Sequence, residues 1–109
     1  MYNIVLLIGR LTDKPHLKTL ENGQIVGNFC IAVQKPFKNM EGEYETNFIH
    51  CSIWNGMAQN MAEYCNKGSL IAVRGHVSTK DEKIVNDKGE QITIKIPSIY
   101  VERVNFLSL

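Results

Sequence analysis

The sequence has little net charge and no long hydrophobic segment. Its 12 Lys and Arg residues nearly balance 11 Asp and Glu residues, which leaves a formal net charge of +1. A globally basic surface is therefore excluded, and binding of a polyanion would have to come from a local arrangement of cations. The apolar run MYNIVLLIGRL lacks the basic region and cleavage site of a signal peptide and is too short to span a bilayer. These absences predict a cytoplasmic protein with no membrane partner.

Cysteine is also scarce, and the pattern of an enzyme active site is missing. The three cysteines are an odd number without a CxxC pair, which is typical of neither a disulfide framework nor a zinc site: Cys30, Cys51 and Cys65. Free thiols in a reducing cytosol are the simpler interpretation. The three histidines have no triad or metal-ligand spacing, and there is no phosphate-binding loop: His16, His50 and His76. We therefore expect no catalytic residue, no cofactor and no bound metal.

The patterns that are present predict an all-β domain over residues 1–109 with one helix. We expect main strands within 3–11, 24–35, 44–54, 69–80 and 99–107, with an extended β-hairpin between the last two. The first strand is apolar on both faces, which fits either a strand buried on both faces or a strand of a tight barrel. Residues 56–67 carry a helical pattern, and Gly68 is the expected cap. A helix between the third and fourth strands is typical of the OB-fold, a five-stranded Greek-key barrel that commonly binds oligonucleotides.

The stretch YETNFIHCSIW, residues 44–54, is the most informative strand. Because successive side chains of a strand alternate, Phe48, His50 and Trp54 share one face, and Cys51 and Ile53 belong to the other. Spaced aromatic rings with polar neighbours suit the stacking of unpaired bases. The alternative is that one end of this face belongs to the core and the other end is ordinary surface.

A second aromatic residue lies among cations. Phe37 stands between Lys35 and Lys38 in a loop or strand end, and an aromatic ring flanked by cations suits stacking beside a phosphate contact. The alternative is a hydrophobic plug beneath a loop.

Several motifs occur together and in order along the chain: GRLTDKP at 9–15, GNFCIAV at 27–33, KPFKN at 35–39, NFIHCSIW at 47–54, AEYCNKGSLIAVRG at 62–75 and VNFL at 104–107. In this order and spacing they resemble the bacterial single-stranded DNA-binding protein family. The resemblance implies an OB-fold without catalytic activity that binds unpaired DNA regardless of sequence. It also implies a homotetramer, with a dimer as the alternative, and a nucleoid-associated role in replication, recombination, repair or DNA uptake.

The resemblance also assigns individual residues. It implies base stacking on Phe37, Phe48 and Trp54, whereas a fourth family aromatic falls near Ile84, which has no ring. Lys80 matches a cation used on phosphate, and His50 and Ser78 fall where some members carry Arg. The resemblance leaves further cations as candidate phosphate contacts: Arg10, Lys14, Lys35 and Lys38.

Many family members continue into a flexible tail with an acidic tip that recruits other enzymes. This sequence stops at Leu109, as expected of either a natural short form or a core alone, so we expect no recruitment through such a tail. Two other functions stay open: a different OB-fold binder, such as a replication-restart or RNA-binding module, and a purely oligomeric interaction protein.

Overall fold

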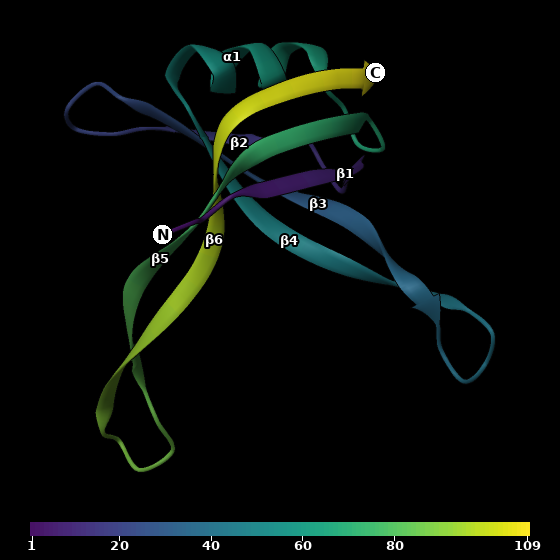
Figure 1. Cartoon of the computed structure of the whole chain (residues 1–109). Helices are drawn as coiled ribbons and strands as arrows, with labels where there is room; N and C mark the ends of the chain where they lie inside the picture. The colour runs from purple at the N-terminus through teal and green to yellow at the C-terminus, as the bar shows by residue number, and fades with distance from the viewer.

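The computed structural model describes residues 1–109 as six strands and one helix (Figure 1). In chain order these are β1 Val5–Leu11, β2 His16–Thr19, β3 Ile25–Lys38, β4 Tyr44–Trp54, α1 Asn55–Tyr64, β5 Leu70–Val85 and β6 Gln91–Ser108. No helix has both the length and the apolar character needed to cross a membrane.

Five of the strands close into a barrel. They are hydrogen-bonded in the order β1, β5, β6, β4 and β3, and β1 returns to β3 through the pairs Arg10 with Ala32 and Leu11 with Ile31. The short strand β2 pairs with β3 outside this ring. The closed five-stranded barrel with a helix between its third and fourth main strands confirms the predicted OB-fold.

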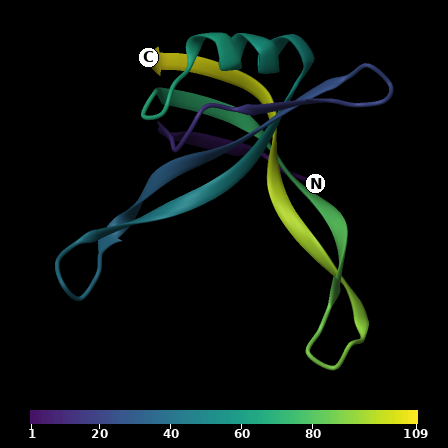
Figure 2. The same cartoon turned by 180° about the vertical axis from the view of Figure 1, so that it is seen from behind.

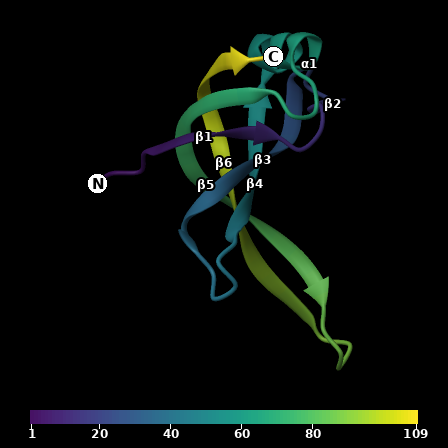
Figure 3. The ribbon, with the colours of Figure 1, turned by 90° about the vertical axis from the view of Figure 1, so that its right-hand side faces the viewer.

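The core fills the barrel and extends beneath α1, which lies at the end opposite the two long hairpins (Figures 1 and 3). One cluster of buried side chains makes up this core: Leu11, Phe29, Ile31, Cys51, Ile53, Ala58, Met61, Cys65, Ile71, Val73, Ile99 and Val101. Two inward residues of β4, Cys51 and Ile53, are fully buried, and Ile49 of the same parity packs against the core while partly buried.

The helix is shorter than the sequence pattern predicts. It covers Asn55–Tyr64 instead of residues 56–67, and Cys65 is already extended although its N–H still donates to the Met61 carbonyl oxygen at 2.9 Å. Gly68 is not the helix cap. It has a φ of +90° in the following turn, where its N–H donates to the Leu11 carbonyl oxygen at 2.8 Å. This tertiary hydrogen bond ties the turn after the helix to β1.

Two long hairpins extend from the barrel as diverging arms, β3–β4 and β5–β6 (Figures 1 and 2). The β5–β6 arm is paired from Leu70 with Ser108 to Val85 with Gln91, so both strands are longer than predicted. Pro97 lies within β6 opposite Thr79. Its missing N–H is tolerated because β6 pairs with β4 only at Ile99 and Tyr100, which leaves Pro97 on an open edge.

Of the two interpretations of β1 that the sequence left open, the structure has the strand of a tight barrel, with only one face buried. Val5 and Leu7 pack against the core, but Leu6 is 72% exposed and Ile8 is 62% exposed. Their outward face is apolar yet no other element of the chain covers it. We call the outward side chains of Ile4, Leu6 and Ile8 the β1 face.

Candidate nucleic-acid interface

The outward side chains of β4 form a continuous surface on the barrel wall. We call Phe48, His50, Ser52 and Trp54 the β4 face. Their partners on β3 are, in the same order, Ala32, Cys30, Asn28 and Val26. Because directly opposed residues of a sheet point to the same side, the small or polar partners leave the middle of this face open.

Phe48 is the most exposed ring on the β4 face, at 69%. Its cross-strand partner is Ala32, whose methyl group is too small to cover the ring. Beside it lies a hollow of about 250 Å³ that β4 shares with both strands of the β5–β6 arm, including Val77 and Pro97. An aromatic ring next to an open hollow can accept a flat ligand on its face.

Trp54 is only partly accessible. Its ring stacks on Tyr100 of β6 with a centroid separation of 6.2 Å and an interplanar angle of 24°. The indole Nε1 is buried and has no hydrogen-bond partner. Phe48 and Trp54 therefore share a face, as the alternation predicts, but the two rings differ in how much surface they offer.

His50 lies between two hollows. On one side is the hollow next to Phe48, and on the other is a polar hollow of about 210 Å³. The residues lining the polar hollow come from β2, β3, β4 and the turn after β1: Thr12, Asp13, Lys14, His16, Asn28, Phe29, Cys30 and His50. The structure thus brings Lys14 and His50 to one recess although they are 36 positions apart in the chain.

Phe37 lies farther out, on the β3–β4 arm. It is 80% exposed and belongs to β3 instead of a loop, so it does not plug one. The neighbouring cations are engaged: Lys35 Nζ is 3.3 Å from Glu45 Oε2, and Lys38 Nζ is 5.5 Å from the centre of the Tyr44 ring.

The remaining predicted cations do not gather at one place. Lys80 lies on the β5–β6 arm opposite Ile96, and Ile84 is near the tip of the same arm, paired with Ile92. Arg10 Nη1 donates to the Gly68 carbonyl oxygen at 2.9 Å and lines a recess together with Tyr44. The candidate residues are therefore spread over the barrel wall and both arms.

Two residues outside the predicted site extend a row of rings from Trp54: Tyr100 stacks on Trp54, and His76 stacks on Tyr100. Tyr100 stacks on His76 as well as on Trp54, with a centroid separation of 5.0 Å from the imidazole. Tyr100 pairs with Ser52 across the parallel β4–β6 contact and with His76 across β5–β6. The alternation of His76, Ser78 and Lys80 along β5 was the only sequence signal for His76. No sequence signal indicated Tyr100, because the contact between β4 and β6 joins segments far apart in sequence.

The inner side of β4 is apolar, and burial there keeps the Cys51 thiol protonated. Burial, and secondly the nearby Cys30, raises the pKa of Cys51 to about 12, and burial also raises the pKa of Cys65. All three cysteines are free, and no group of three or more His, Cys, Asp or Glu side chains is arranged to hold a metal ion. Cys30 alone is partly accessible, next to His50.

The chain matches known proteins over nearly its whole length. The model of the single-strand binding protein family covers residues 2–107. The single-stranded DNA-binding protein of Halalkalibacterium halodurans is 41% identical over 107 residues, 98% of this chain and 61% of that protein. Single-stranded DNA-binding protein B of Bacillus subtilis is 36% identical over 107 residues, 98% of this chain and 91% of that protein.

A third relative, single-stranded DNA-binding protein A of Bacillus subtilis, is 38% identical over 107 residues, 98% of this chain and 60% of that protein. The chain thus spans about three-fifths of two of these relatives and nine-tenths of the other. A closed OB barrel with exposed rings on its wall and a family match from end to end lead to one assignment: the chain belongs to the single-strand binding protein family.

Proposed function

We propose that residues 1–109 act as one domain that binds single-stranded DNA without sequence preference. The observation that carries this proposal is the β4 face, where Phe48 is 69% exposed beside an open hollow and His50 lies between that hollow and a second one. Every base has a flat aromatic face, so stacking on such rings does not depend on sequence. The names of the relatives support DNA as the polynucleotide.

In this proposal bases stack on the rings of Phe37, Phe48 and Trp54. Each stacked base contributes on the order of 1 to 3 kcal/mol. Cationic and polar side chains hold the phosphates around them: Arg10, Lys14, Lys35, Lys38, His50 and Lys80. The protein binds and protects the strand without breaking a bond in it, during replication, recombination, repair or DNA uptake, in the cytoplasm and at the nucleoid.

The charge distribution sets an expected salt dependence. The net charge is +1, and Lys35 is already paired with Glu45. Each phosphate neutralised on a single strand makes the slope of log K against log salt more negative by about 0.7. Because the net charge is low and Lys35 is paired, we expect a shallow slope. A slope corresponding to about ten ions for each monomer would contradict the proposed mode of binding.

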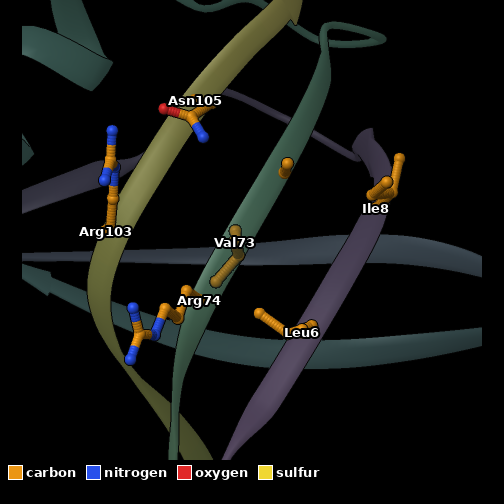
Figure 4. Close-up of a pocket in the computed structure, with 7 residues that line it drawn as sticks. Leu6, Ile8, Val73, Arg74, Arg103 and Asn105 are labelled. Carbon is orange, nitrogen blue, oxygen red and sulfur yellow. The ribbon is translucent and has the colours of Figure 1, made fainter.

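We also propose that the chain assembles into a homotetramer, with a dimer as the alternative. Residues Val5 to Gly9 pair with β5 only, so the other edge of β1 has free backbone groups. Next to the β1 face is an open hollow of about 430 Å³ (Figure 4). Leu6 and Ile8 of β1 line one side of it, and the polar lining residues come from the neighbouring strands: Arg74 from β5, and Arg103 and Asn105 from β6. A free strand edge beside an apolar surface favours pairing with a second copy.

The decisive experiment is a titration of the protein with dT oligomers of increasing length, alongside its mass in solution. We expect Trp54 fluorescence to fall on binding, and binding to DNA to be tighter than to RNA of the same length or to duplex DNA. Preference for RNA would favour a different OB-fold function, and no binding to any polynucleotide would contradict the proposal.

A further inference from the structure

We infer that Tyr100 and His76 form a second base-stacking surface, which carries the DNA strand from the β4 face across β6 onto the β5–β6 arm. This inference rests on the proposed function. It adds a specific route and two binding residues that lie outside the set carried over from the family motifs.

The geometry of three rings supports this surface. Trp54, Tyr100 and His76 come from β4, β6 and β5, and each successive pair is nearly parallel, with interplanar angles of 24° and 20°. The rings therefore form one row across three neighbouring strands. We call this row the Trp54–Tyr100–His76 stack. A row of parallel rings perpendicular to a strand offers bases a path across the sheet instead of along it.

The stack lies outside the hydrophobic core. The neighbours of Tyr100 in sequence, Ile99 and Val101, are buried in the barrel, whereas Tyr100 remains 38% exposed. Because residues of a strand alternate between faces, the Tyr100 ring is on the outer wall, the same side as Ser52 with which it pairs. The barrel interior does not use this ring.

The position of the ring depends on a glycine. A Cβ at Gly75 would overlap the backbone carbonyl of Tyr100, and the pairing of β5 with β6 shifts register between Arg74 and Gly75. Gly75 thus allows β6 to approach β5 closely at Tyr100. This close approach places Tyr100 beside His76, its partner in the register.

The charge at the end of the stack favours a base over a phosphate. His76 Nδ1 is 2.7 Å from Glu102 Oε1, a contact that fixes the imidazole plane. A phosphate group placed there would be repelled by the carboxylate. A neutral base can lie on the ring face without that penalty.

Beyond His76 the outer side of the arm leads to a cation. His76, Ser78 and Lys80 alternate on β5, so their side chains point to the same side. A strand that leaves the stack along this arm reaches Lys80, which the carried-over motif already assigns to phosphate. The stack therefore connects two groups of candidate residues that are otherwise separate, those on the β4 face and Lys80.

The first experiment compares affinities for a series of dT oligomers. Tyr100→Ala should weaken binding roughly five- to a hundredfold for oligomers long enough to pass from β4 to the arm, because one stacking ring is lost. The loss should be much smaller for the shortest oligomers that still bind. Tyr100→Phe should retain affinity, since the ring stays. His76→Ala, like Tyr100→Ala, should weaken binding, although the His76 ring stacks on Tyr100 and not on Trp54.

Tyr64→Ala is the matched control, because Tyr64 is an exposed aromatic residue on α1, away from the stack. The Tyr64→Ala variant should bind every dT oligomer with the affinity of the wild type. Thermal unfolding of all variants shows whether the fold is retained. Equal loss of affinity in Tyr100→Ala at every oligomer length, with His76→Ala unaffected, would overturn the inference, since Tyr100 would then only support Trp54.

A second experiment detects contact directly. Oligomers of dT carrying 5-iododeoxyuridine are irradiated on the wild-type protein, and the crosslinked residues are identified by mass spectrometry. Crosslinks to Tyr100 or His76 are expected. Crosslinks to Phe48 or Trp54 alone would overturn the inference and leave the proposed function in place, whereas absence of all binding would overturn both.

Discussion

The β4 face and the β1 face are both uncovered outer surfaces of one barrel, yet they differ in chemistry. On β4 the exposed ring of Phe48 is followed by His50 and Ser52. On the β1 face the exposed residues Ile4, Leu6 and Ile8 are all aliphatic, and the first polar residue of the same parity is Arg10. Both surfaces point outward from the barrel, but β4 is paired with β3 and β6 whereas much of β1 has a free edge, so side chains and strand pairing together distinguish them.

The difference indicates two kinds of partner. Aromatic rings interleaved with hydrogen-bonding groups suit flat, polar-edged bases. Aliphatic side chains beside a free strand edge suit another protein surface, which removes them from water. We therefore propose DNA as the partner of the β4 face and a second copy of the chain as the partner of the β1 face, and the predictions below test that division.

The largest effect is expected from charging the β1 face. The double substitution Leu6→Lys with Ile8→Lys should abolish assembly, because it places cations in an apolar contact that cannot solvate them. Light scattering after size exclusion should give the mass of a single chain. Val85→Lys, at an exposed apolar residue on the β5–β6 arm, is the control and should leave the mass unchanged. An unchanged mass for the double variant would remove the β1 face from the interface.

The next effect is the loss of a ring from the β4 face. Phe48→Ala should lower affinity for oligo-dT roughly five- to a hundredfold while leaving the melting temperature and the mass in solution unchanged, because the ring is exposed. Fluorescence anisotropy with labelled oligo-dT measures the affinity. If the variant binds normally but no longer assembles, the two surfaces have been assigned the wrong way round.

A smaller effect is expected from a fixed charge at His50. His50→Arg should tighten binding about two- to fivefold, the range of one exposed ion pair, and should steepen the slope of log K against log salt by about 0.7. Asn60→Arg adds the same charge on α1 and should change neither value appreciably. An unaltered slope for His50→Arg would mean that no phosphate passes this side chain.

The last prediction concerns stability and the inner side of β4. An unfolded thiol has a pKa near 9.0, whereas burial raises the pKa of Cys51 to about 12. Between these values the unfolded chain has released the proton and the folded chain retains it, so the free energy of unfolding falls as pH rises. The urea midpoint of unfolding should therefore fall more between about pH 8 and about pH 10.5 in the wild type than in Cys51→Ala. Parallel changes would show that Cys51 is not buried in solution.

Much of the fold could be predicted because its signals are local. The alternation in YETNFIHCSIW placed Phe48 and Trp54 on one side and Cys51 and Ile53 on the other, and the structure has the same division. The order of strands and helix was sufficient for the OB barrel. The end of the helix was not predictable, because the turn at Gly68 is held by a hydrogen bond to Leu11 in a distant strand.

The arrangement around the candidate site was less predictable. The stacking of Tyr100 on Trp54 depends on a parallel contact between β4 and β6, and no pattern within either strand indicates its neighbour. The apolar β1 face could equally have been core, as the sequence pattern suggested. Whether an apolar side chain is buried depends on which element covers it.

The sequence by itself determined which side chains of each strand share a face, since that follows from the backbone geometry of every extended residue. Only the tertiary structure decided which faces remain uncovered and which rings from distant strands meet, as Trp54, Tyr100 and His76 do. The physical reason is that alternation is fixed by adjacent residues, whereas exposure and stacking depend on how the closed barrel places separate strands beside one another.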